Sequence, residues 1–219
     1  GEYDGGGYSI SGLTINRSGE SYVGLFGATF TGVTIKNLSL TNVNITGRNK
    51  TGSLAGYVYI NTIIENSSAS GSVNGDSHVG GLVGGVNNKV TISNSYSTAS
   101  VDGARFYIGG LAGNAQGSIH ILNSYSTGSV ATTSTIYGYY TGGLLGNAVG
   151  ITCTNCFYNK ETSGKSDNRA GPSSGKTTAE MKTLATFTNT ATAGLSTSWD
   201  FNNIWKIDTS GTINGGYPY

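Results

Sequence analysis

One five-residue string returns along this chain at nearly constant spacing. Each copy centres on a leucine, and the glycine two positions after that leucine never changes. The copies are VGLFG 23–27, GSLAG 52–56, GGLVG 80–84, GGLAG 109–113 and GGLLG 142–146. Successive leucines are 29, 28, 29 and 33 residues apart. A period near 28 is the signature of a repeat architecture, in which each unit packs on its neighbours.

Other columns of residues keep the same period. An asparagine follows each leucine by 11 or 12 residues: Asn37, Asn66, Asn94, Asn123 and Asn155. Two residues before it stands Ile35, Ile64, Ile92, Ile121 or Cys153, and two residues after it stands Ser39, Ser68, Tyr96, Tyr125 or Phe157. Apolar and polar residues alternate with period two between these positions, which predicts short strands joined by Gly, Asn and Ser turns.

Stacked coils satisfy this pattern, because equal spacing places like residues above one another. The sequence therefore predicts an all-β fold, a right-handed parallel β-helix (β-solenoid) of about five to six coils. The leucine and isoleucine columns would face inward, and Tyr96, Tyr125 and Phe157 would stack on each other. We expect the glycines to take positive φ at corners and to let stacked backbones approach closely. We expect the asparagines to form a ladder in the left-handed conformation.

Composition narrows the function classes. The chain has 219 residues with a net charge of +1, and 11% of the residues are charged, so nothing indicates a nucleic-acid partner. No apolar run is long enough to span a membrane. Many Ser, Thr, Asn, Gly and Tyr residues with few Lys and Glu residues favour a secreted or bacterial cell-surface location. The first residues match only half of a unit, which suggests a chain cut from something larger or matured by cleavage.

The two cysteines stand close together, at Cys153 and Cys156. No βαβ pattern surrounds them, so the spacing does not indicate a redox-active motif. Either a local disulfide or two packed thiols is consistent with the sequence. With two cysteines and no paired histidine the sequence predicts no metal site, and it predicts no cofactor.

The repeat pattern stops after Tyr158. We therefore divide the chain into β-helix repeats at 1–158 and a C-terminal loop, short helix and capping segment at 159–219. Thr177 and Glu180 form a capping box that predicts one short α-helix over about 178–187. An open coil end exposes unpaired strand edges, so we expect an aromatic cap to plug it, made by Met181, Leu184, Phe187, Trp199, Phe201 and Trp205.

These features resemble the GLUG-repeat family, which is named for a glycine-leucine-any-glycine string. The opening YDGGGYSISGLTI 3–15, the strands NSYSTASV 94–101 and NSYSTGSV 123–130, and the ending KTTAEMKT 176–183, WDFNNIWKID 199–208 and GGYPY 215–219 are similar to the family's pattern. The resemblance implies a secreted or surface-anchored bacterial protein with right-handed β-helical repeats. Such repeats occur inside adhesin-like chains, immunoglobulin-A metallopeptidases and carbohydrate-active enzymes. The resemblance implies no catalytic residue set.

Val73, Val101 and Val130 follow three of the repeated asparagines by seven residues. One edge of the coils varies in length between this valine column and the next leucine string. Its loops are Arg48–Lys50, Asp76–His78, Arg105–Tyr107 and Ile136–Tyr140. Aromatic residues in variable loops suit a sugar or a protein partner. The candidate ligand-binding residues are Phe106, Tyr107, Tyr137, Tyr139 and Tyr140.

Parallel β-helices also include polysaccharide lyases and hydrolases, which need converging carboxylates. The best catalytic candidates here are Asp76, His78 and Arg105, which fall in adjacent coils of the variable edge. The acids do not share a column, so we assign no catalytic residue and predict that the chain is not an enzyme.

The sequence thus favours a non-catalytic extracellular module for adhesion and structural spacing. Its partner would be a cell-surface glycan, or a host or neighbouring protein, without nucleic acid and without membrane insertion. Two alternatives stay open. One is an accessory or catalytic domain of a secreted polysaccharide-active enzyme. The other is a self-assembling filament subunit that associates through the uncapped N-terminal coil.

Overall fold

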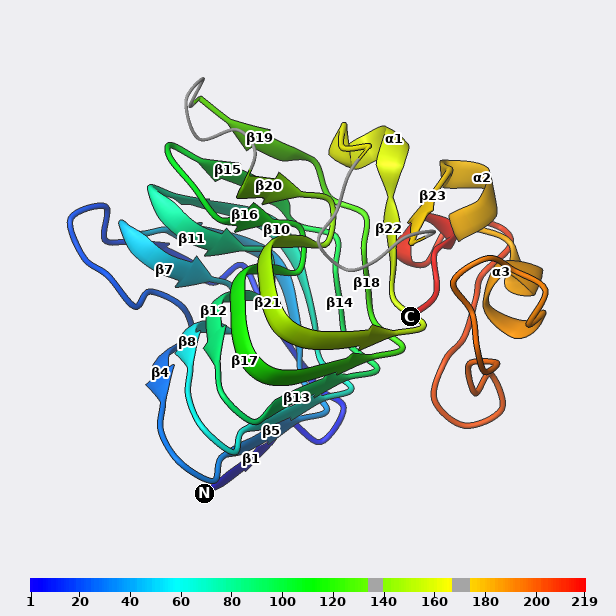
Figure 1. The fold of residues 1–219 in the computed structure, drawn as a ribbon, viewed down its shortest axis with the longest axis horizontal. Helices are drawn as coiled ribbons and strands as arrows, with labels where there is room; N and C mark the ends of the chain where they lie inside the picture. Colours follow the sequence, from blue (N-terminus) through cyan, green and yellow to red (C-terminus); the bar gives the residue numbers. More distant parts are fainter. Residues whose placement is uncertain (134–139, 167–173) are drawn as a thin grey trace.

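The chain winds as a parallel β-solenoid of about five turns, with a C-terminal segment along one flank (Figure 1). The computed structural model describes residues 1–133, 140–166 and 174–219. Within this described part the strands form three parallel sheets, which are the three walls of the coil.

The first and second walls each combine two strand positions of the coil, whereas the third wall repeats one. The first wall holds β1 (Glu2–Asp4), β5 (Thr34–Lys36), β9 (Ile63–Glu65), β13 (Val90–Ser93), β4 (Phe26–Thr29), β8 (Ala55–Val58), β12 (Val83–Asn87), β17 (Ala112–Leu122) and β21 (Leu145–Thr154). The second wall holds β2 (Ser9–Ser11), β3 (Thr14–Asn16), β6 (Ser39–Thr46), β10 (Ser68–Gly75), β14 (Tyr96–Ser97), β15 (Ser100–Gly103), β18 (Tyr125–Ser126), β19 (Val130–Thr132), β22 (Phe157–Asn159) and β23 (Gly175–Lys176). The third wall holds β7 (Asn49–Gly52), β11 (Ser77–Gly80), β16 (Ile108–Gly109) and β20 (Thr141–Gly142).

The predicted leucine column is confirmed. The amide of Leu54 donates to the carbonyl of Leu82 at 2.9 Å, and Leu82 donates to Leu111 at 3.0 Å. Leu54, Leu82, Leu111 and Leu144 are fully buried in one continuous apolar core, with Leu25 packed against it. The isoleucine column is buried beside it, since Ile64, Ile92 and Ile121 pair in register. Like residues therefore lie on like residues in both inward columns.

The asparagine column forms the predicted left-handed corners. Asn37, Asn66, Asn94, Asn123 and Asn155 have φ between 45° and 55°. Asn66 donates its Nδ2 to Oδ1 of Asn37 at 3.1 Å, and Asn155 donates likewise to Asn123 at 3.1 Å. The amide of a short side chain thus links corners of neighbouring coils.

The expectation of positive φ at the repeated glycines is wrong. Gly27, Gly56, Gly84, Gly113 and Gly146 are absent from the residues with positive φ. These glycines serve close backbone approach instead, because a Cβ on Gly113 would lie 2.6 Å from the carbonyl carbon of His78 in the preceding coil.

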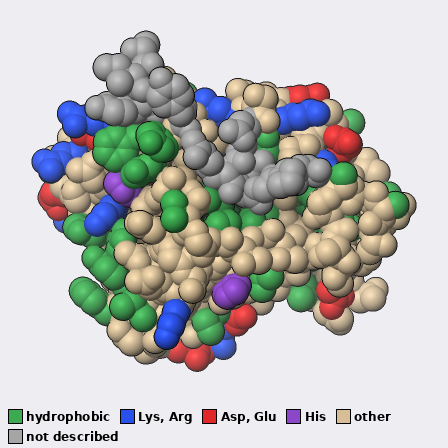
Figure 2. Space-filling view, viewed as in Figure 1, with side chains coloured by type: hydrophobic (Ala, Val, Ile, Leu, Met, Phe, Trp, Pro, Cys, Tyr) green, Lys and Arg blue, Asp and Glu red, His purple; other side chains and the backbone are tan. Residues whose placement is uncertain are grey.

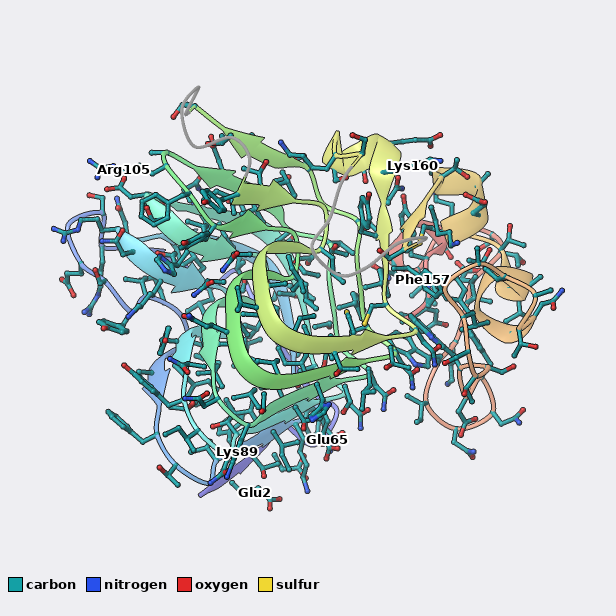
Figure 3. The ribbon with its side chains drawn as sticks, viewed as in Figure 1. Glu2, Glu65, Lys89, Arg105, Phe157 and Lys160 are labelled. Carbon is teal, nitrogen blue, oxygen red and sulfur yellow. The ribbon has the colours of Figure 1, made fainter. Side chains whose placement is uncertain are left out.

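The aromatic cap does not plug the coil end. Tyr96, Tyr125 and Phe157 belong to three successive coils, and the apolar residues of the C-terminal segment pack on this column from outside. Phe157 points from β22 toward that segment (Figure 3). Trp205 contacts Tyr96 and Tyr125, with ring centroids 6.1 Å and 6.0 Å apart. The segment therefore forms a second apolar cluster on the flank, distinct from the core inside the coil.

The C-terminal segment also differs from its predicted elements. The single helix over 178–187 is two helices, α2 (Thr178–Met181) and α3 (Leu184–Thr188), because the backbone leaves the helical conformation at Thr183 (φ −107°, ψ 120°). The capping box of Thr177 and Glu180 is present. A further helix, α1 (Lys160–Ser163), follows β22, and a 3₁₀ turn, η2, spans Asn214–Gly216. Leu184 is exposed and takes no part in the cap.

Both cysteines are free thiols. Cys156 is buried and its Sγ donates to the carbonyl of Ile121 at 3.3 Å. Burial raises the pKa of the Cys153 thiol well above its usual value, and the contact with Cys156 raises it further. The packed-thiol interpretation thus fits this structure. Within the described residues, no helix has the length and apolar character that crossing a membrane requires.

Candidate functional site

A column of outward-facing side chains runs along one corner of the solenoid. It consists of Tyr22, Lys50, His78, Tyr107 and Tyr140, each just before a residue of the third wall. The residue that follows the first four, namely Val23, Thr51, Val79 or Ile108, is buried. We call these five residues the outward column.

The first four members of the outward column have a costly backbone conformation. Tyr22, Lys50, His78 and Tyr107 have φ values of 65°, 57°, 55° and 63°. The left-handed region costs a residue with a Cβ about 1–2 kcal/mol, and glycine would occupy it more easily. Bulky side chains held there in four successive coils indicate a use for those side chains.

The invariant glycine of the repeated string supports this column. A Cβ on Gly56 would lie 2.5 Å from the carbonyl carbon of Tyr22, and one on Gly84 would lie 2.6 Å from that of Lys50. Each glycine thus lies against the peptide bond that follows an outward-column residue of the preceding coil. The string that defines the repeat is therefore what lets the left-handed corner pack.

Neighbouring side chains of the outward column contact each other. Lys50 donates its Nζ to the Tyr22 hydroxyl at 3.0 Å and lies 4.1 Å from the centroid of the Tyr57 ring. His78 packs edge-on against Tyr107 at 4.9 Å between centroids, and Tyr107 packs edge-on against Tyr140 at 5.1 Å. The column is thus a nearly continuous aromatic strip with a cation near one end.

Three of the five predicted ligand-binding residues come together at this corner. Phe106 lies 4.9 Å from Tyr107 and 5.7 Å from His78 between ring centroids, and Tyr140 completes the group. Tyr137 and Tyr139 lie outside the described residues. Figure 2 shows hydrophobic side chains gathered at this corner, beside the residues drawn in grey.

The N-terminal half of the strip was not predicted from the sequence. Tyr22 and Tyr57 lie 6.0 Å apart between centroids, Tyr57 and Tyr59 lie 4.4 Å apart, and Phe30 stacks on Tyr59 at 5.8 Å with an interplanar angle of 2°. Phe30 is 73% exposed. Because Lys50 and His78 interrupt the tyrosines of the outward column, only the spacing of 28 or 29 residues between its first four members could have revealed it. We call the outward column together with Phe30, Tyr57, Tyr59 and Phe106 the aromatic edge.

His78 is the titratable centre of the aromatic edge. Burial lowers its pKa to about 4, and the nearby Lys50 ammonium lowers it as well. Its Nδ1 is buried and has no hydrogen-bond partner among the described residues. Lys50 in turn lowers the pKa of the Tyr22 hydroxyl through their hydrogen bond. The imidazole is therefore neutral at physiological pH and acts as another ring of the strip.

The predicted catalytic candidates do not form a constellation. Asp76 and Arg105 are joined through their backbones, since the amide of Arg105 donates to the carbonyl of Asp76 at 2.8 Å. In the described part of the chain no ion pair joins their side chains, and His78 packs on rings instead of a carboxylate. Arg105 lies in the loop that joins β15 to β16 (Figure 3). Across residues 1–133, 140–166 and 174–219, no cluster of three His, Cys, Asp or Glu residues could hold a metal.

The fold and this corner define a parallel β-solenoid whose repeated glycines seat a strip of outward side chains. The sequence model of the GLUG motif matches residues 47–74 and 104–131, so this solenoid carries GLUG-motif repeats, as the resemblance implied. The first match includes Lys50 of the outward column and the repeated Asn66. The second includes Tyr107 and the repeated Asn123.

One solved structure shares the architecture. It is a Bacteroides ovatus protein described as a "putative immunoglobulin A1 protease", with a TM-score of 0.63 and 18% sequence identity. The match covers 99% of this chain and 76% of that one. At this identity the likeness concerns the fold. No curated protein matches this chain in sequence.

Proposed function

We propose that the chain is a non-catalytic extracellular module for adhesion and structural spacing, which binds a cell-surface glycan through the aromatic edge. The observation that carries the proposal is the left-handed backbone of Tyr22, Lys50, His78 and Tyr107. In four successive coils the residue that carries the outward side chain adopts this energetically unfavourable conformation. A purely structural corner would use glycine or asparagine, as the asparagine corners of the same coils do.

The chemistry of the edge suits a sugar. Tyrosines offer an apolar ring face together with a hydroxyl that donates and accepts hydrogen bonds. The hydroxyl of Tyr57, which accepts from Asn87 Nδ2 at 3.1 Å, and the ammonium of Lys50 lie among the rings. A rigid coil holds these groups in line without ordering a loop when the ligand binds, which lowers the entropic cost of binding.

The spacing role rests on the stacked geometry. Parallel coils about 4.8 Å apart make a stiff rod, whose length grows with each repeat. The extracellular location is supported by composition and by the resemblance, and the lack of a catalytic constellation among the described residues agrees with a binding role.

A glycan array probed with the whole chain tests the proposal. Tyr107→Gly removes a central ring and keeps the backbone conformation, and Tyr140→Ala removes its neighbour. Each variant should weaken glycan binding about tenfold, which corresponds to about 1.4 kcal/mol. Tyr8→Gly is the control, because Tyr8 is a tyrosine that is 79% exposed and belongs to no part of the edge. Absence of glycan binding, or equal binding by all four proteins, would reject the proposal.

A further inference from the structure

A second concave surface lies at the asparagine corner, away from the aromatic edge. It is a groove of about 790 Å³ between the outer face of the early coils and the C-terminal segment. Its volume is within the range of about 300–1,000 Å³ typical of small-ligand pockets. We call it the asparagine groove; its lining includes Asn37, Asn66, Asn94 and Tyr96 on the coil side, and Ile204, Trp205 and Lys206 on the other.

The asparagine ladder is interrupted inside this groove. Hydrogen bonds join Asp4 to Asn37, Asn37 to Asn66, Asn94 to Asn123 and Asn123 to Asn155. In the described structure no such bond joins Asn66 to Asn94, although both belong to the ladder and both line the groove. The Oδ1 of Asn66 and the Nδ2 of Asn94 therefore remain an acceptor and a donor on adjacent rungs.

The opposite wall adds an aromatic surface. Trp205 lines the groove and packs against Tyr96, and its Nε1 is buried with no hydrogen-bond partner among the described residues. Ile204, beside it, is 43% exposed. Reciprocal 2.9 Å backbone hydrogen bonds between Lys206 and Tyr219 hold this wall in place. Trp205 itself is 3% exposed, so this wall of the groove presents mainly Ile204 and the edge of the aromatic cluster opposite the amides of the coil.

The backbone of the coil wall is already paired. The amide of Asn66 donates to Ser93 at 3.1 Å, that of Asn94 donates to Leu122 at 3.0 Å, and that of Tyr96 donates to Ser67 at 3.1 Å. A peptide binding as an added strand needs free backbone groups along an edge. The groove instead offers the side-chain amides of the ladder and the ring of Tyr96, which suit a ligand that carries many hydroxyl groups.

The charges that line the groove also favour an uncharged ligand. Among the side chains that line it, one is a carboxylate and one is an ammonium, namely Asp4 and Lys206. Asp4 is already engaged by the amide of Gly6 at 2.9 Å and by Asn37 Nδ2 at 3.0 Å. Asn37 to Asn94 spans two rungs, about 10 Å of coil axis. From these contacts we propose that the asparagine groove is a second binding site, which takes a neutral linear oligosaccharide and is independent of the aromatic edge.

Titration calorimetry with the whole chain tests this site. The probes are cellotetraose, laminaritetraose, β-1,4-mannotetraose and chitotetraose at up to millimolar concentration. Asn66→Gly and Asn94→Gly remove the amides and keep the left-handed backbone, and Asn123→Gly is the matched ladder variant outside the groove. Ile204→Arg, at an exposed position, narrows the groove without touching the coil. Thermal unfolding of each variant verifies that it is folded.

At least one tetrasaccharide should bind, and each groove variant should weaken it about fivefold or more, since one lost hydrogen bond is worth about 1 kcal/mol. Asn123→Gly should keep the affinity within about twofold by the same energy scale. Tyr107→Gly should also keep it, which separates this site from the aromatic edge. The proposal would be overturned if no tetrasaccharide bound, or if Asn123→Gly lost as much affinity as the groove variants. Unchanged binding in Ile204→Arg, or a loss of affinity in Tyr107→Gly alone, would overturn it as well.

Discussion

Tyr96 and Tyr125 stack face to face, with ring centroids 4.9 Å apart and an interplanar angle of 6°. They lie one coil apart on the outside of the second wall, and the C-terminal segment covers them. The Tyr125 hydroxyl donates to the carbonyl of Pro218 and accepts from Asn214 Nδ2 at 2.8 Å. An aromatic column of the repeats is thus the surface on which the end of the chain packs, and its first member, Tyr96, also lines the asparagine groove.

The leucine column should carry much of the coil's stability. Leu82→Ala should lower the free energy of unfolding by about 2–5 kcal/mol, because Leu82 is fully buried and the cavity cannot collapse between stacked coils. Chemical denaturation measures this loss. Leu184→Ala, the same change at a side chain that is 44% exposed, should cost less than about 0.5 kcal/mol. Similar losses in the two variants would contradict the inward column.

The repeated glycine should not tolerate a methyl group. In Gly84→Ala the new Cβ would lie 2.5 Å from the carbonyl oxygen of Gly56 and 2.6 Å from the carbonyl carbon of Lys50. Backbone atoms of a neighbouring coil must then shift, so we expect a loss of about 1–3 kcal/mol in unfolding free energy. Gly19→Ala serves as the control, since a Cβ there meets nothing within 4 Å. A stable Gly84→Ala protein would refute the close-approach role of the motif glycine.

Asn155 should anchor the C-terminal segment. Its Oδ1 accepts from the amide of Ser196 at 2.7 Å and from the Ser196 hydroxyl at 2.9 Å, while its Nδ2 continues the ladder to Asn123. Asn155→Gly leaves those donors unpaired, at a cost of about 1–3 kcal/mol. Trp199 and Trp205 should then become more exposed, which a red shift of tryptophan fluorescence reports. Asn123 makes no contact with Ser196, so the control variant Asn123→Gly should keep the native emission spectrum.

Stability should fall in mild acid because of His78. Its pKa in the folded protein is about 4, below the unfolded value of about 6.5. Between these values the unfolded chain binds more protons, so the unfolding free energy decreases as the pH falls from about 6.5 toward 4. We expect a loss on the order of 1 kcal/mol, less than the full shift implies because the ring is partly exposed and screened.

Unfolding free energies of the parent and of His78→Asn across pH 4–7.5 measure this effect. Asparagine tolerates the left-handed backbone and does not titrate, so the variant should show a shallower dependence on pH over that window. If the unfolding free energies of the two proteins changed equally with pH, His78 would be excluded as the source of the pH dependence.

The repeated spacing in the sequence by itself determined the architecture of this protein. Five leucines and five asparagines at nearly equal spacing leave stacking as the way to bury the apolar columns, and the left-handed asparagine corners follow from the residue type. The same spacing identified Phe106, Tyr107 and Tyr140 as neighbours.

Tertiary structure decided which face of the coil each column occupies. Alternation with period two does not carry across a corner, since each left-handed residue changes the direction of the chain. The sequence could therefore not show that Tyr96 and Tyr125 lie outside the coil, or that the tryptophans pack on its flank instead of its end. The outward column of Tyr22, Lys50, His78 and Tyr107 and the asparagine groove likewise join residues of different types or of distant segments. Long-range packing brings them together, and no local pattern records it.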